Sequence, residues 1–166
     1  MLFIEDFPWL TAMIAVPAVA GALVWLITPL RRYARPIGLV ISLLVLAAAV
    51  ALATGFDFGA DAQVQYAYTA SWIPDLGISY VLGVNGMGLV LVLLAAFLVP
   101  IVLLAAWREV RAPESAPEDQ AALESRQAGF VALILVLLAL IVLVFSARDL
   151  FLFYLAFEAM LFPVYF

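Results

Sequence analysis

The sequence contains no cysteine, no histidine and no lysine. Disulfides, thiol chemistry and cysteine-ligated metals are therefore excluded, as are histidine ligands to haem and imidazole acids or bases. Charged residues make up 11% of the 166 residues and hydrophobic residues 69%, whereas a soluble domain is about a quarter charged and about half apolar. Seven arginines against twelve acidic residues leave no basic patch that could bind DNA or RNA. What remains is a polytopic membrane protein in the lipid bilayer.

Five apolar runs predict transmembrane helices, each of which needs about 20 apolar residues to cross the bilayer. The runs are continuously apolar rather than alternating, which favours helices over barrel strands. Pro17 and Pro100 fall inside the first and third runs, which favours a bundle whose neighbouring helices satisfy the freed carbonyls. The expected fold class is thus all-α, a polytopic bundle of five helices near residues 7–28, 37–53, 89–107, 128–146 and 150–166, the fifth truncated at the C-terminus.

The arginines predict how the chain is oriented. Six of the seven fall in the loops after the first and third runs, and by the positive-inside rule those loops are cytoplasmic and the N-terminus is outside. Glu5 and Asp6 precede the first run without any basic residue, which is the opposite of a secretory signal peptide. The arginines of the predicted cytoplasmic loops are Arg31, Arg32, Arg35, Arg108, Arg111 and Arg126, and Arg148 lies on the other side.

The predicted outside loop, residues 56–88, holds six aromatic residues and no basic residue. Val64, Tyr66 and Tyr68 alternate with small or polar residues, and residues 74–77 (PDLG) have turn chemistry. A hairpin lying on the membrane surface and a simple interfacial belt of aromatic residues are both compatible with this pattern.

The predicted cytoplasmic loop, residues 108–127, is the most polar stretch, with eight charged residues. Residues 115–118 (SAPE) form a capping box that could start a short helix running into the fourth span. The acidic residues here either contact a partner subunit or belong to a solvated connector.

One charged residue, Glu158, lies inside a predicted span. It follows Asp149 by nine residues, about 13 Å along a helix, which places it near the middle of the bilayer. An acidic residue there costs about 2.5–3.5 kcal/mol on insertion scales, so it is expected to have a function. A carboxyl group that exchanges between neutral and charged forms can accept a proton and pass it on.

Two tyrosines extend this polar feature. Tyr154 and Tyr165, at positions i−4 and i+7 from Glu158, lie on the same predicted helical face. Pro163 cannot donate to the carbonyl of Ala159, which leaves an acceptor free nearby. We expect Glu158 to be a proton relay, with Tyr154 and Tyr165 as a possible polar file. The alternative is a protonated Glu158 that ties two helices together.

The segment 146–166 (SARDLFLFYLAFEAMLFPVYF) resembles the fifth-helix signature of the antiporter-like subunits of respiratory complex I. The proline and tyrosine after the glutamate are similar to the subunit M, or chain 4, family of proton-pumping NADH–quinone oxidoreductases. A second segment, 72–86 (WIPDLGISYVLGVNG), is similar to the stretch before the third helix in that family, and residues 7–10 (FPWL) are a looser likeness.

The resemblance implies a proton-translocating subunit in which Glu158 is the relay residue and pairs functionally with lysines on later helices. It also implies two regions, residues 1–127 with three spans and residues 128–166 as the start of the proton-translocation domain. Asn85 stands where the family usually has aspartate, and Phe157 stands where tryptophan often precedes the glutamate. Family members continue for many more helices, so we expect a fragment or a truncated frame.

The leading hypothesis is therefore a complex I membrane subunit whose partners are neighbouring antiporter-like subunits, in a bacterial inner membrane. No cofactor is expected in the chain itself, since it has no glycine-rich dinucleotide fingerprint and no cysteine ligand. Two alternatives stay open: a subunit of a multisubunit sodium/proton antiporter, and a structural membrane element that does not transport.

Overall fold

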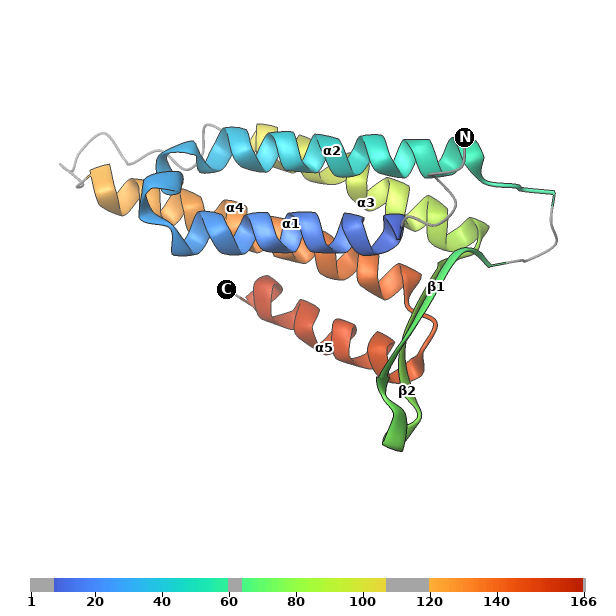
Figure 1. Cartoon of the computed structure of the whole chain (residues 1–166). Coiled ribbons are helices and arrows are strands. Elements are labelled where there is room, and N and C mark those ends of the chain that lie inside the picture. Colours follow the sequence, from blue (N-terminus) through green and yellow to red (C-terminus); the bar gives the residue numbers. More distant parts are fainter. Residues whose placement is uncertain (1–7, 60–63, 107–119, 166) are drawn as a thin grey trace.

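The computed structural model describes residues 8–59, 64–106 and 120–165. Helices dominate these residues, with one short hairpin inserted between the second and third long helices (Figure 1). The elements in chain order are α1 (Trp9–Leu26), the 3₁₀ helix η1 (Thr28–Tyr33), α2 (Ala34–Gly55), β1 (Gln65–Ile73), the 3₁₀ helix η2 (Pro74–Leu76), β2 (Ile78–Val84), α3 (Gly86–Ala105), α4 (Gln120–Ser146) and α5 (Leu150–Tyr165).

The expected helical membrane fold is confirmed, with a small antiparallel sheet added to it. Each predicted span coincides with a helix, and four helices of the described residues are long and apolar enough to cross a membrane. The fourth helix differs most from its predicted span, because α4 begins at Gln120, eight residues before that span. Trp107 at the end of the predicted third span, and the predicted capping box at residues 115–118, lie outside the described residues.

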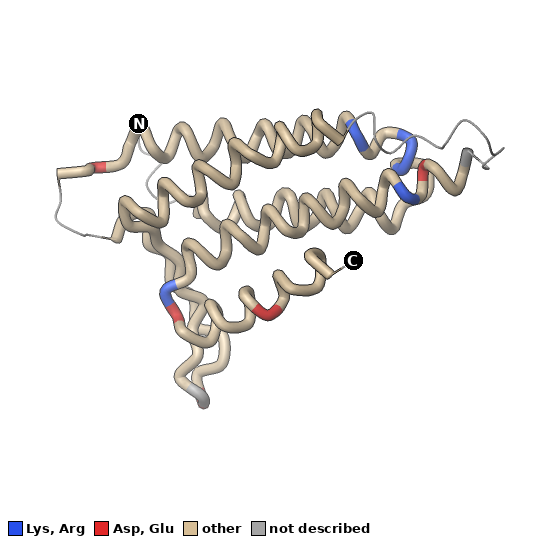
Figure 2. Tube along the Cα trace, turned by 180° about the vertical axis from the view of Figure 1, so that it is seen from behind, with Lys and Arg blue, Asp and Glu red and all other residues tan. Residues whose placement is uncertain are grey.

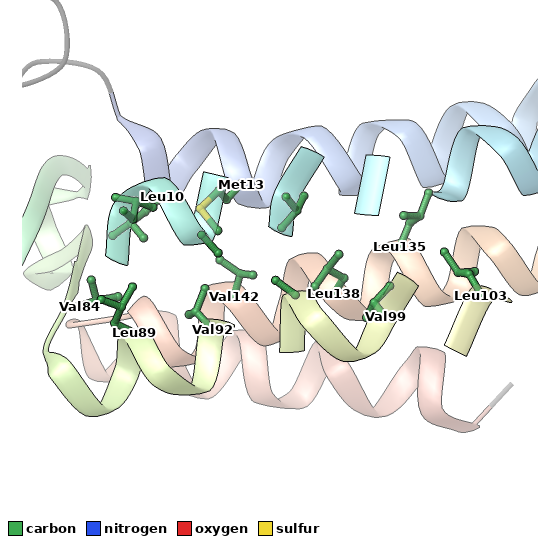
Figure 3. Close-up of a cluster of buried hydrophobic side chains, with 14 of the residues drawn as sticks. Leu10, Met13, Val84, Leu89, Val92, Val99, Leu103, Leu135, Leu138 and Val142 are labelled. Atoms are coloured by element: carbon green, nitrogen blue, oxygen red, sulfur yellow. The ribbon is translucent and has the colours of Figure 1, made fainter. Parts of the chain in front are cut away.

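Helix α4 lies at the centre of the bundle and packs against α1, α2, α3 and α5. Its buried side chains include Leu135, Leu138 and Val142, all 0% exposed. Figure 3 shows them meeting Leu10 and Met13 of α1 on one side and Val92 and Val99 of α3 on the other. Pro17 and Pro100 are also buried, so the predicted packing of the proline-containing helices in a bundle is confirmed.

Two glycines let neighbouring helices come close to α4. A Cβ atom added to Gly21 of α1 would lie 2.9 Å from the carbonyl oxygen of Ala132, and one added to Gly38 of α2 would lie 2.5 Å from Cγ1 of Val131. Small residues at such crossings are typical of membrane helices, where close van der Waals contact replaces the hydrophobic driving force. The bundle is therefore held by close packing along α4.

The two ends of the bundle differ in charge. Arg31 and Arg32 in η1, Arg35 in α2 and Arg126 in α4 lie at one end. Figure 2 shows these basic positions together, and a single basic position beside an acidic one at the opposite end. The hairpin and the α4–α5 connection share that opposite end (Figure 1). The predicted orientation requires this distribution of charge. That the arginine-rich end faces the cytoplasm stays a prediction.

A hairpin forms within the predicted outside loop, which is one of the two interpretations that the sequence left open. β1 and β2 pair antiparallel, with Ser71 opposite Ser79 and Gln65 opposite Val84. The turn forms at the predicted residues, where the Gly77 N–H donates to the Pro74 carbonyl at 3.0 Å. Gly77 has φ +67°, a left-handed conformation that glycine adopts without steric cost.

Candidate functional site

Helix α5 starts at a well-defined cap. The Oδ1 atom of Asp149 accepts hydrogen bonds from the backbone N–H groups of Phe151 and Leu152, both at 3.0 Å. An acidic side chain at this position satisfies free N–H groups and complements the positive end of the helix dipole. The direction of α5 is therefore set at its first turn.

Helix α5 packs against α4 along one narrow stripe. Leu152, Ala156 and Pro163 are its buried residues, spaced so that they share one side of the helix. At about 100° per residue, Glu158 lies about 200° around the helix from Ala156 and about 220° from Pro163. Glu158 is exposed in the described part of the chain. The predicted relay residue thus faces away from the bundle formed by α1–α4.

Glu158 has a polar neighbour on the same face. The Tyr154 hydroxyl, one turn before Glu158, interacts with the Glu158 carboxylate. Tyr154 is 59% exposed and Tyr165 is 86% exposed, so all three predicted site residues occupy the open side of α5. The structure brings Tyr154 and Glu158 together, whereas Tyr165 lies about two turns farther along the helix. Their role in proton transfer stays a prediction.

Apolar side chains flank the carboxylate. The rings of Phe153 and Phe157 stack with centroids 6.2 Å apart and planes inclined by 17°. Phe157, where the related family often has tryptophan, therefore keeps an aromatic contact along α5. Pro163 lies inside the helix, so it provides no N–H for the carbonyl one turn earlier. The carboxylate and the Tyr154 hydroxyl sit within an otherwise apolar surface.

Three residues that sequence reasoning did not select connect the hairpin to the helices. The Tyr66 hydroxyl donates to the Leu52 carbonyl of α2 at 2.9 Å, and the Tyr80 hydroxyl donates to Oγ1 of Thr11 in α1 at 3.3 Å. Burial raises the pKa of both tyrosines above the usual 10, so both hydroxyls stay protonated donors at neutral pH. The third residue is Arg148, whose guanidinium donates to the Gly83 carbonyl of β2 at 3.2 Å.

Asn85, where the related family usually has aspartate, is the N-cap of α3. Its Oδ1 accepts a hydrogen bond from the Gly88 N–H at 2.9 Å. Asparagine and aspartate are about equally good N-caps. The departure from the family pattern therefore preserves the local structure.

Comparisons with known proteins were made by family models, by sequence and by structure. No protein-family model matches the chain. The chain is similar to NADH-quinone oxidoreductase subunit M of Mycobacterium tuberculosis, with 36% identity over 179 residues, which cover 98% of this chain and 32% of the relative. It is also similar to NAD(P)H-quinone oxidoreductase chain 4 3 of Picosynechococcus, with 37% identity over 165 residues, which cover 96% of this chain and 27% of the relative.

Among solved structures, a chain of respiratory complex I from Thermus thermophilus with bound NADH has a similar fold. The TM-score is 0.70 and the identity is 26%, over 93% of this chain and 27% of that chain. This chain therefore spans about a third of the length of the curated relatives it matches.

Proposed function

Because the chain is homologous to subunit M, or chain 4, of NADH–quinone oxidoreductases over nearly its whole length, we propose that it takes part in proton translocation within such a complex. Its helices make it a multi-pass membrane protein. The proposal extends to its surroundings, a bacterial inner membrane and neighbouring antiporter-like subunits. The activity and partners of the whole protein are part of this proposal, since the chain covers only about a third of its relatives.

The observation that carries the proposal is the acidic side chain on the open face of α5. Glu158 and Tyr154 form a polar pair on a helix that is otherwise apolar, and they face away from α1–α4. A carboxylate in a membrane helix is costly, and such residues usually face a protein interior or an aqueous path. An open polar face is the geometry expected of a relay residue whose next proton donor or acceptor lies on another helix.

In the proposed mechanism, the Glu158 carboxylate accepts a proton from one side of a relay and releases it to the other. The Tyr154 hydroxyl donates a hydrogen bond to the carboxylate and so orients it on the open face of α5. The stacked rings of Phe153 and Phe157 lie beside the pair on the same helix. Electron transfer takes place elsewhere in the complex, and its energy reaches Glu158 as a change in conformation or in neighbouring charge.

The test is Glu158→Gln, which keeps the size of the side chain and removes its ability to exchange a proton. The variant is made in the native gene, and proton translocation per NADH oxidised is measured in inverted membrane vesicles. We expect translocation to fall by at least about tenfold, the effect of losing a positioned acid–base group. Translocation at the parental level would mean that Glu158 is not a relay and would favour the structural alternative.

Glu124→Gln is the matched control, because Glu124 lies near the start of α4 at the arginine-rich end of the bundle. The same chemical change there is expected to leave translocation unchanged. Purification distinguishes a complex I subunit from a subunit of a sodium/proton antiporter. A complex I subunit purifies with quinone-reducing activity. An antiporter subunit purifies with sodium/proton exchange and without NADH oxidation.

A further inference from the structure

The connection between α4 and α5 is attached to the hairpin. The Arg148 backbone N–H donates to the Val81 carbonyl at 2.8 Å, and its side-chain Nε–H donates to the Gly83 carbonyl at 3.2 Å. The preceding residue, Ala147, forms an antiparallel bridge with Leu82. The connection therefore lies along β2 as a short third strand would. We call these contacts of Ala147 and Arg148 with residues 81–83 the junction clasp.

The hairpin side of the junction clasp is firmly held. Leu82 and Val84 are both 0% exposed, and they belong to the same buried cluster as the helices. The tyrosine hydrogen bonds to α1 and α2 hold the two strands from the other side. An attachment to β2 is thus an attachment to the helices α1 and α2.

The α5 side of the junction clasp is the start of the helix. Asp149 follows Arg148 directly and caps the first turn. The next residue but one, Phe151, places its ring 6.3 Å from that of Trp72 in β1, edge to face. Both contacts lie within three residues of Arg148, so the guanidinium lies at the point where the start of α5 meets the hairpin.

Small movements at this point would be enlarged at Glu158. The carboxylate-bearing residue lies nine positions after Asp149, about 13 Å along the helix, so a tilt of about 10° moves it by about 2 Å. The stripe of α5 that contacts α4 is a single row of residues, which resists rocking less than contacts on two sides. A misplacement of about 1 Å is enough to slow a positioned reaction by up to about a hundredfold.

We propose that Arg148 is a positioning residue for the proton relay, acting through the junction clasp to hold α5 and Glu158 in place relative to α1 and α2. This inference rests on the proposed function of Glu158. The part of Arg148 that acts is its directed Nε–H donor. The aliphatic stem lies beside Gly83, where an added Cβ atom would lie 3.7 Å from Cγ of Arg148.

Two substitutions separate the donor from the charge. In Arg148→Gln the amide nitrogen occupies the place of Nε, so the donor is kept and the charge is lost. In Arg148→Met the length is similar, but both the donor and the charge are lost. Arg32→Gln is the matched control, because it removes an arginine charge at the opposite end of the bundle, where the guanidinium lies 4.6 Å from the ring centre of Tyr33.

The measurements are proton translocation per NADH oxidised and the infrared carbonyl band of protonated Glu158, both in native membranes. The band is identified by its loss in Glu158→Gln, and its frequency reports the hydrogen bonding of the carboxyl group. We expect Arg148→Met to lower translocation by about tenfold or more and to displace the band. Arg148→Gln and Arg32→Gln should keep the parental band and stay within about twofold of parental translocation.

The outcomes distinguish the two proposals. If Glu158→Gln translocates at the parental level, the proposed function fails. Two results would contradict the role of the Arg148 donor. One is that Glu158→Gln is inactive while Arg148→Met behaves as the parent. The other is that Arg148→Met and Arg148→Gln are equally impaired. If Arg148→Met does not assemble, the test rests on Arg148→Gln. In that variant, a displaced infrared band of Glu158 contradicts the proposed role of the junction clasp, and a band at the parental frequency supports that role.

Discussion

Helices α4 and α5 follow one another along the chain, but they differ in how much of their surface is buried and in where their polar side chains lie. α4 is surrounded by α1, α2, α3 and α5, and eight of its residues between 121 and 146 are buried. α5 buries only Leu152, Ala156 and Pro163, and it carries a carboxylate and a tyrosine hydroxyl on the opposite face. The eight buried residues of α4 are Ala128, Val131, Ala132, Leu135, Leu138, Ala139, Val142 and Ser146.

The difference between the two helices follows from how helices associate in a bilayer. Lipid is as apolar as leucine, so helices in a bilayer associate through close packing rather than through the hydrophobic effect. α4 fits this requirement, because glycines of α1 and α2 approach it closely. A carboxylate contributes nothing to such packing and costs insertion energy. The buried packing of the described chain is therefore concentrated in α1–α4, and its proposed chemistry in α5.

The largest expected effect compares the same deletion in the two helices. Leu135 in α4 is 0% exposed, and Leu155 in α5 is 44% exposed. Leu135→Ala leaves a cavity and is expected to lower the free energy of unfolding by about 2–5 kcal/mol, whereas Leu155→Ala changes it by less than about 0.5 kcal/mol. Denaturant titration of the purified protein in bicelles measures both. Equal losses would show that the open side of α5 is packed as tightly as α4.

A smaller effect is expected from a substitution on α5 that changes a polar group and leaves the packing unchanged. Tyr154→Phe removes only the hydroxyl that interacts with the Glu158 carboxylate, on an exposed face of α5. Proton translocation should therefore fall, while the unfolding free energy stays the same, because the ring and its packing are kept. Tyr33→Phe, in η1 at the arginine-rich end, is the control and should affect neither quantity. Loss of stability without loss of translocation in Tyr154→Phe would reverse the assignment of α5 to chemistry.

Much of this division could be predicted from the sequence. Long apolar runs indicate helices because a bilayer offers no other partner for backbone N–H and C=O groups. Glu158 was identified because its charge is exceptional in such a run. The turn at residues 74–77 was predicted because only a few residue types adopt the required backbone conformations. The hairpin beside it is one of two interpretations of the pattern. The strand pairing confirms that a hairpin forms, and its place at the membrane surface stays a prediction.

The contacts that fasten the hairpin could not be predicted, for a physical reason. Tyr66 and Arg148 both donate to backbone carbonyls, at Leu52 and Gly83, and every residue has a carbonyl. No pattern of side chains therefore marks the acceptor. Tyr66 also has φ +55°, next to an irregularity in the pairing of β1, a conformation that its sequence does not favour.

The smallest expected effect concerns Asn85, the N-cap of α3. Asn85→Ala removes the N-cap of α3 and should lower the free energy of unfolding by about 1 kcal/mol, whereas Asn85→Asp should change it by only a few tenths of a kcal/mol. Neither variant should alter proton translocation per NADH oxidised, because α3 belongs to the packed part of the molecule. Thermal unfolding and vesicle assays on the same preparations provide the two measurements.

Asn85→Asp is the more demanding test of the two, because it introduces the aspartate that the resemblance to the family implies and keeps the cap. Its only lasting change is a negative charge directly after β2, the strand whose Gly83 carbonyl accepts from Arg148. A change in translocation with unchanged stability would mean that this charge reaches the relay on α5. The separation between a packed α1–α4 and a chemically active α5 would then not hold, and the proton path would have to be extended to the start of α3.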